Sequence, residues 1–312
     1  MPFSSRPRSA RRTDWPVPER HDRSTASRTQ AHSLAGAPGR HLERAVPCRG
    51  RRVRPSYPSY RDSGISWLGE LPTHWDAVRL KFMATYRTSS VDKKSNADEI
   101  PVRLCNYTDV YYGERIRAED GKFMVATATA HEVERFGLRV GDVLITKDSE
   151  DWQDIGVPAL VEDSAEDFVC GYHLGIVRAG EAVDPGYLFR ALQSDGVNKQ
   201  LQVAATGVTR YGISNRAVEE AVIPMPPLAE QRAITMFLAH ATGRIDELVE
   251  RTGFKDRGSL VAGAVGSLIE RLREYRSALI TAAVTGKIDV RGADSVDAAA
   301  TDASSVGSEA AT

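Results

Sequence analysis

Two runs of apolar residues with alternating spacings of four and three residues constrain the fold of this chain more than any other feature. The first run is Ile234, Leu238, Ala241, Ile245 and Leu248, and the second is Val261, Val265, Leu268, Leu272, Tyr275, Leu279 and Ala282. This spacing places an apolar stripe along one side of a helix, as in the a and d positions of coiled coils. We therefore predict two long antiparallel helices within residues 225–290, which pack on each other or on a partner chain. An ordinary helical hairpin that closes the same domain is the alternative.

The limits of this helical region are also marked. Pro226-Pro227 favours a helix start, and Glu230 then lies in the first turn, where the helix dipole favours an acidic side chain. Gly286 followed by Lys287 is typical of a helix C-terminus. Gly253 and Gly258 indicate a break between the two helices.

Residues 59–224 combine several strand patterns with one clear helix start. A turn at Gly141 leads into an apolar strand at 142–146, and 102–110, 155–161 and 168–177 are further strand candidates. Asp184 followed by Pro185 predicts a helix, with Asp184 as the N-cap. Leu188, Leu192 and Leu201 are expected to face its core. The predicted fold class is α+β: a mixed α/β domain, followed by a long antiparallel, coiled-coil-like helical region.

Charge is divided unevenly along the chain. The formal net charge is −1, yet residues 1–60 carry thirteen Arg, no Lys and only four acidic residues. Few aliphatic residues and many Arg, Ser and Pro predict a disordered Arg-rich extension over residues 1–58. It is either a nucleic-acid-binding arm or, as we favour, a passive tail or an extension from a start codon placed too far upstream. Residues 291–312 are predicted to be a disordered tail.

The sequence favours a soluble cytoplasmic protein. It contains no run of 18 apolar residues, so no membrane-spanning helix is expected, and its N-terminus lacks the apolar core of a secretory signal. The three cysteines lie far apart, which argues against a disulfide framework or a structural zinc site.

No pattern for catalysis is apparent. Gly286-Lys287 is followed by Ile288, so it is not a phosphate-binding loop, and residues 224–228 lack the amide and the aromatic residue of an adenine methyltransferase motif. Asp142, Lys147 and Asp148 are weak candidates for a nuclease site, and the seven His residues lack metal-ligand spacing. We expect no catalytic residue, no metal and no cofactor, which suits a recognition or scaffolding subunit.

Three segments resemble the specificity subunits of Type I restriction–modification systems. SGISWLGELPTHW at 63–75 is similar to the start of their target recognition domain, PPLAEQRAI at 226–234 to the start of their first conserved helix, and REYRSALITAAVTGKID at 273–289 to the end of the second. The resemblance covers about residues 57–291. The chain departs from the family in having one recognition domain, at 59–224, where a full subunit has two.

The resemblance implies a non-catalytic role. In this family each recognition domain reads one half of a split DNA target, while the conserved helices set the spacing and dock the methyltransferase subunits. The implied partners are double-stranded DNA and the methyltransferase (M) and restriction (R) subunits. The half-length chain is expected either to pair as a homodimer or to be a truncated, non-functional or purely protein-binding remnant. An autonomous endonuclease is a third alternative.

Candidate contact residues follow from both lines of reasoning. Polar residues in glycine-flanked loops are the DNA-binding candidates, with the loop at 206–212 favoured: Thr206, Gly207, Thr209, Arg210, Tyr211, Lys147, Ser149, Tyr172 and His173. The resemblance and the apolar stripes predict a subunit interface at Leu228, Glu230, Gln231, Ile234, Leu238, Ile245, Leu248, Leu268, Leu272, Tyr275 and Leu279. Residues 61–290 carry a net charge of −7, so we expect either a locally basic face or phosphate neutralisation by partner subunits.

Overall fold

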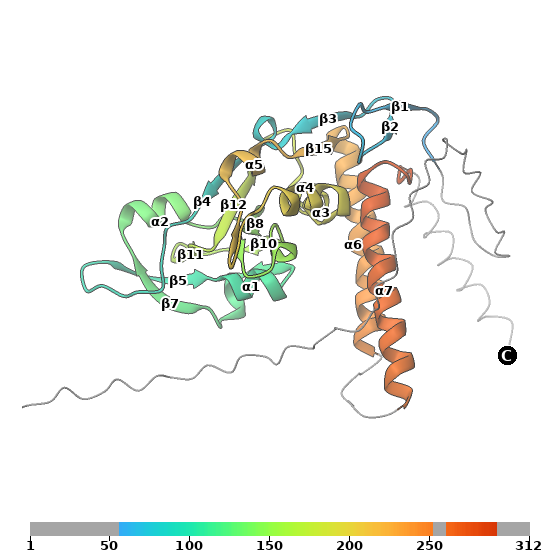
Figure 1. Cartoon of the computed structure of the whole chain (residues 1–312). Coiled ribbons are helices and arrows are strands. Elements are labelled where there is room, and N and C mark those ends of the chain that lie inside the picture. The colour runs from blue at the N-terminus through green and yellow to red at the C-terminus, as the bar shows by residue number, and fades with distance from the viewer. Residues whose placement is uncertain (1–55, 252–259, 292–312) are drawn as a thin grey trace, which may run out of the picture. The chain divides into compact units, whose positions relative to one another are not determined.

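The computed structural model describes residues 56–251 and 260–291, with side chains for 56–251 and 266–291 (Figure 1). The predictions for residues 1–55, for the break at Gly253 and Gly258, and for residues 292–312 lie outside the described residues. Mixed strands and helices occupy the chain up to Met225, and two long helices follow.

A five-stranded sheet lies at the centre of the α/β part. Its strand order is β4 (Ala84–Thr88), β12 (Leu174–Ala179), β8 (Asp142–Thr146), β10 (Pro158–Asp163) and β6 (Arg115–Arg117). Neighbouring strands are antiparallel except β10 and β6. Strand β8 is buried along its whole length, and its side chains alternate between two hydrophobic clusters, with Val143 and Ile145 in one and Leu144 in the other.

The two faces of this sheet are covered differently. On one face lie α3 (Pro185–Gln193) and α4 (Asp195–Val203), whose core residues include the fully buried Tyr187 and Phe189. The other cluster joins a three-stranded sheet of β11 (Phe168–Cys170), β5 (Ile100–Cys105) and β7 (Met124–Ala128), together with α2 (Ala130–Phe136). The predicted N-cap is confirmed, because Asp184 Oδ1 accepts a hydrogen bond of 2.8 Å from the Tyr187 amide.

Three strand predictions are wrong in part. The strand predicted at 155–161 is β10, which begins only at Pro158, and the other two predictions continue past the end of a strand. The predicted strand at 168–177 is two strands, β11 and β12, which belong to different sheets and are separated by a turn at 171–173. The predicted strand at 102–110 ends at Cys105, because Asn106 and Asp109 form a capping box that begins α1 (Tyr107–Tyr112). In both cases local hydrogen bonding ended an apolar run that the residue pattern continued.

The remaining elements are short. The pairs β1 (Tyr60–Asp62) with β2 (Glu70–Pro72), and β3 (Asp76–Arg79) with β15 (Val222–Met225), are antiparallel. Short helices are η1 (Leu80–Phe82), η2 (Ala118–Asp120), η3 (Trp152–Asp154) and α5 (Asn215–Glu219). Because β3 and β15 pair, the α/β part begins and ends at neighbouring positions.

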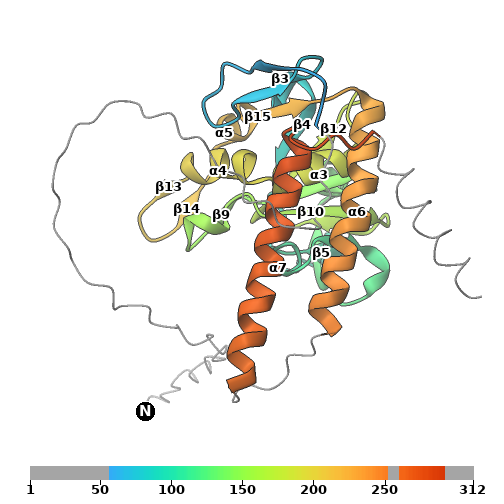
Figure 2. The same ribbon diagram turned by 90° about the vertical axis from the view of Figure 1, so that its right-hand side faces the viewer.

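The two long helices α6 (Leu228–Arg251) and α7 (Leu260–Val284) run antiparallel and contact each other and α3 (Figures 1 and 2). Gly286 has φ +69°, and Lys287 donates its amide to Ala282 O at 2.8 Å, which ends α7 in a Schellman motif as predicted. Five of the residues expected at a subunit interface are instead buried inside this chain: Gln231, Ile234, Leu238, Ile245 and Leu279. Leu248, Leu268 and Tyr275 are exposed, and Leu228, Glu230 and Leu272 are half-buried.

The carboxylate of Glu230 joins the N-terminal segment to α6. Its Oε2 accepts hydrogen bonds from the Tyr57 hydroxyl at 3.1 Å and from Trp75 Nε1 at 2.9 Å, and its Oε1 lies 2.7 Å from His74 Nε2. Trp75 is fully buried, so its indole N–H depends on this acceptor.

The end of α7 meets the same place. Tyr60 donates its hydroxyl to Gly286 O at 2.9 Å, and Lys287 Nζ donates to Glu70 O at 2.8 Å. A side chain on Gly286 would collide with Pro72. The segments 57–75, 226–234 and 284–290, far apart in the sequence, therefore form one junction.

A second polar network ties α3 and the loop before β6 to both long helices. The buried Arg190 donates to Thr242 Oγ1 at 3.0 Å, and its Nη1 lies 3.7 Å from Glu114 Oε2. Arg276 donates to the same Glu114 oxygen at 2.6 Å and lies 3.1 Å from Asp246. Burial lowers the pKa of Arg190 to about 10, with Glu114 opposing that shift, so the guanidinium stays charged at neutral pH.

Glu230→Ala is expected to lower the free energy of unfolding by about 2–4 kcal/mol, because it leaves the buried Trp75 N–H without its acceptor. Urea denaturation followed by tryptophan fluorescence measures the change. Glu247→Ala, which removes a surface pair with Arg251 on the same helix, is the control and should cost at most about 0.5 kcal/mol. Equal losses for the two variants would contradict the role of Glu230.

Candidate nucleic-acid interface

A short hairpin presents the loop at 206–212. Strands β13 (Thr206–Gly207) and β14 (Tyr211–Gly212) pair with each other, and β14 pairs with β9 (Asp148–Ser149), where Tyr211 lies opposite Ser149. Gly207 has φ +151°, and a side chain there would collide with the Arg210 carbonyl, so the turn requires glycine. Val208 at the tip is 91% exposed.

Backbone hydrogen bonds bring a third segment to this hairpin. The Lys147 amide donates to His173 O at 3.1 Å, and the Lys147 carbonyl accepts from the Ile213 amide at 2.9 Å. Residues 147–149, 171–173 and 206–213 are thereby held side by side, directly after the buried strand β8. We call the side chains of Lys147, Asp148, His173 and Arg210 the basic cluster.

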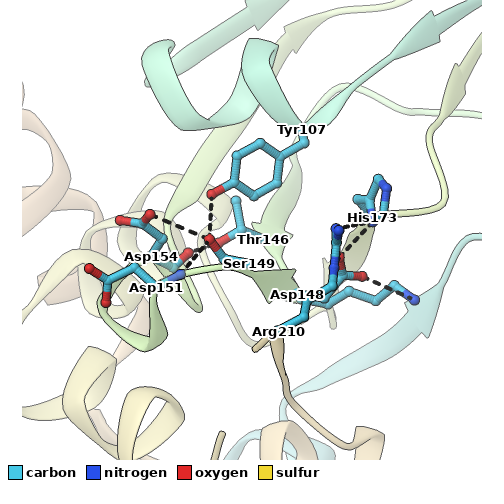
Figure 3. Close-up of polar contacts among 9 residues, drawn as sticks. Tyr107, Thr146, Asp148, Ser149, Asp151, Asp154, His173 and Arg210 are labelled. Carbon is cyan, nitrogen blue, oxygen red and sulfur yellow. Dashed lines mark hydrogen bonds and ion pairs between the residues drawn. The ribbon is translucent and has the colours of Figure 1, made fainter. Parts of the chain in front are cut away.

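Asp148 is the acceptor at the centre of the basic cluster (Figure 3). Its Oδ1 accepts from Arg210 Nε at 3.0 Å and from Arg210 Nη2, and lies 2.6 Å from His173 Nδ1. Lys147 Nζ lies 3.8 Å from Oδ2. Burial lowers the pKa of His173 in spite of the neighbouring Asp148, and the charge of Arg210 acts in the same direction as burial. The imidazole is therefore neutral at pH 7.

A second set of polar contacts fixes β9 from the other side. The Tyr107 hydroxyl donates to Ser149 Oγ at 3.2 Å, and Ser149 Oγ donates to Asp154 at 3.4 Å (Figure 3). The Tyr111 hydroxyl also donates to Asp154, at 3.1 Å. Burial and the Asp154 charge raise the pKa of Tyr111 to about 12. Burial also raises the pKa of Asp154, against its hydrogen bonds from Tyr111 and Ser149.

The structure brings the predicted DNA-binding residues to one region of the chain. Thr206, Gly207, Thr209 and Arg210 lie exposed on the hairpin, and Tyr211, Lys147, Ser149, Tyr172 and His173 are half-buried or buried beside it. His173 lies in a turn and not on the expected strand, and its ring packs 3.6 Å from that of Tyr172 between centroids. Sequence reasoning missed Tyr107 and Asp154 as members of this site. It considered Asp148 as part of the segment 147–149 and as a nuclease candidate, without its role as the acceptor for Arg210.

The nuclease candidates do not form a shared site. Asp142 is buried and accepts two hydrogen bonds from Arg178, at 2.6 and 2.7 Å, whereas Asp148 is bound by Arg210. Among the described residues, no group of three or more His, Cys, Asp or Glu side chains is arranged to hold a metal ion. None of the helices described is both long and apolar enough to cross a membrane.

Comparison with known proteins finds two curated proteins with similar sequences. No family model matches the chain. It is 24% identical over 198 residues to the putative type I restriction enzyme MjaX specificity subunit of Methanocaldococcus jannaschii, covering 59% of this chain and 44% of that protein. The type I restriction enzyme MjaVIII specificity subunit of the same organism is 24% identical over 186 residues, covering 59% and 42%.

Both proteins to which the chain is similar are Type I specificity subunits. The chain spans less than half the length of these two relatives. The solved HsdS subunit from Thermoanaerobacter tengcongensis is 23% identical over 58% of this chain and 45% of that one, with a TM-score of 0.42. The match to a structure from work on assembly of the type I R-M system covers 70% of this chain and 47% of that one, at 18% identity and a TM-score of 0.44.

The ionisation of His173 tests the geometry of the basic cluster. Removing the anion with Asp148→Asn should lower the pKa of His173 further, and removing the cation with Arg210→Ala should raise it. NMR titration of the imidazole C–H signals measures both changes, with Asp151→Asn as a control that should leave the pKa unchanged. Shifts in the same direction for the first two variants would contradict the arrangement.

Proposed function

We propose that this chain is a DNA-recognition subunit of a Type I restriction–modification complex, without catalytic activity of its own. The observation that carries the proposal is the sequence match to two Type I specificity subunits. Under this proposal residues 59–224 form the target recognition domain, and residues 225–290 form a coiled-coil-like helical spacer that docks the methyltransferase subunits. The restriction subunits are the other partners of the complex. The chain directs these subunits to a split target.

The basic cluster and the hairpin supply the chemistry that DNA reading requires. Arg210 is 51% exposed, and its guanidinium has the planar donor geometry that fits a guanine edge or a phosphate. Thr206 and Thr209 are exposed hydroxyl residues of the same hairpin, and such groups hydrogen-bond bases and phosphates. The backbone bonds at Lys147 hold the three segments in place before DNA arrives, which limits the entropy lost on binding.

Arg210→Ala should weaken binding to the target duplex by about 1–3 kcal/mol if Arg210 contacts a base. The target is identified first, by selection from a random duplex library with the chain and its methyltransferase partner, and affinities are then measured by fluorescence anisotropy. Arg135→Ala, on α2, makes the same charge change and should have little effect. Partner binding with no sequence preference in the selected DNA would instead favour the protein-binding remnant, and metal-dependent cleavage by the chain alone would favour an endonuclease.

We further propose that two copies pair to supply two recognition domains, which would read a target with two-fold symmetry. Leu248 near the end of α6 and Leu268 near the start of α7 support this, because they are 51% and 49% exposed although they continue the buried apolar stripes. Such exposed leucines on neighbouring helices are suited to a helical interface.

Leu248→Glu combined with Leu268→Glu should convert a dimer into a monomer, because charged side chains would be buried at the pairing surface. Light scattering on the purified chain measures the mass, with and without the methyltransferase subunit. Ala239→Glu is the control, since nine residues along α6 place it on the opposite side of the helix from Leu248. A wild-type chain that is a monomer under both conditions would overturn the pairing proposal.

A further inference from the structure

Asp148 binds the side chain of Arg210, which is the side chain of the hairpin best suited to contact DNA. Its carboxylate Oδ1 accepts from both Arg210 Nε and Arg210 Nη2, a two-donor arrangement that phosphate oxygens and guanine also accept. A DNA group therefore competes with Asp148 for the same guanidinium donors. This competition is a feature of the chain itself and does not depend on which sequence is read.

The position of Asp148 is more constrained than that of Arg210. Asp148 lies in β9, paired with Gly212, and its side chain is 19% exposed, whereas that of Arg210 on the hairpin is 51% exposed. Breaking the pair therefore means that Arg210 turns outward while the carboxylate stays behind. The carboxylate would then be left beside Lys147 and His173.

The position of the imidazole proton on His173 supports Asp148 as the acceptor for Arg210. A distance of 2.6 Å between His173 Nδ1 and Asp148 Oδ1 requires a proton between the two atoms, because two lone pairs would repel each other. Nδ1 is then a donor, so the Arg210 Nη2 atom 3.0 Å away cannot also donate to it. His173 thus holds the carboxylate in place, and Asp148 is the acceptor for Arg210.

We propose that Asp148 is a specificity-determining residue, which binds Arg210 in the free protein and is displaced only by a DNA site that offers better acceptors. The proposal rests on the proposed DNA-recognition function. A target site offsets the cost of separating Arg210 from Asp148 through well-placed base contacts, whereas on other DNA Arg210 stays bound to Asp148 and contributes no contact. Specificity is a difference between two affinities, and Asp148 lowers the non-target affinity more because it withholds Arg210 there.

The test uses random-sequence duplex DNA, the full-length chain and salt concentrations from 50 to 200 mM. Asp148→Asn should tighten binding about tenfold, equivalent to about 1.4 kcal/mol. It should also steepen the dependence of log affinity on log salt concentration by about one, because Arg210 then neutralises an additional phosphate.

Asp151→Asn is the matched control. Asp151 lies two residues from β9, is exposed and accepts a hydrogen bond from the Gln153 amide, and among the described residues it forms no hydrogen bond or ion pair with Arg210. Asp151→Asn removes the same charge from the same loop, so it measures the effect of one lost negative charge on DNA affinity in general. Asp148→Asn combined with Arg210→Ala completes a double-mutant cycle, in which the gain from Asp148→Asn should disappear.

The outcomes separate this inference from the function on which it rests. Equal effects of Asp148→Asn and Asp151→Asn, or a gain that survives in the double variant, would overturn the role of Asp148 while leaving DNA recognition intact. No binding of any duplex at 50 mM salt by the wild-type chain or by Asp148→Asn, measured both alone and with the methyltransferase partner, would overturn both proposals. Circular dichroism checks each variant for folding, and Asp148→Ser repeats the comparison if the asparagine variant is unfolded.

Discussion

The rest of this structure depends on the hydrogen bonds that the carboxylate of Glu230 accepts. Glu230 lies in the first turn of α6 and receives hydrogen bonds from Tyr57 and from the fully buried Trp75. An indole N–H buried without an acceptor is costly, so the N-terminal segment is held to the helix start. Because the end of α7 meets the same segment through Tyr60, one junction fixes both helices relative to the strands that lead into the α/β part.

Much of the fold follows from patterns that are local in the sequence. The apolar stripes of α6 and α7, the N-cap at Asp184 and the helix end at Gly286 are all set by spacings of a few residues. The stripes did not reveal which leucines remain exposed, because Leu238 is buried in a core cluster that also contains residues of α3, whereas Leu248 lies outside that cluster. The division of 168–177 between two sheets is also a long-range effect, which depends on pairing with β5 and β4.

The residue types of the candidate site were predictable from the sequence, but the hydrogen bonds and ion pairs between these residues were not. Glycine-flanked polar segments identified the hairpin at 206–212 and the segments 147–149 and 171–173, and the structure shows that the latter two lie beside the hairpin. The central position of Asp148 depends on backbone pairing across 62 residues, which no local pattern encodes. The same applies to Tyr107, whose hydroxyl reaches Ser149 from the start of α1. The candidate site therefore contains an acidic residue where charge patterning alone would favour basic ones.

The pairing of β3 with β15 gives the molecule a modular architecture. The chain leaves the Glu230 junction through β3 and returns to it through β15, so the residues between these strands resemble an insertion into a frame made of the N-terminal segment and the two long helices. A segment of different length or sequence between the same two strands would leave the hydrogen bonds of the Glu230 junction unchanged. Such a segment would still have to replace the contacts of α3 and of the loop before β6 with the long helices, such as those from Arg190 to Thr242 and from Arg276 to Glu114. Exchange of the segment between two short strands is open to this chain on those terms.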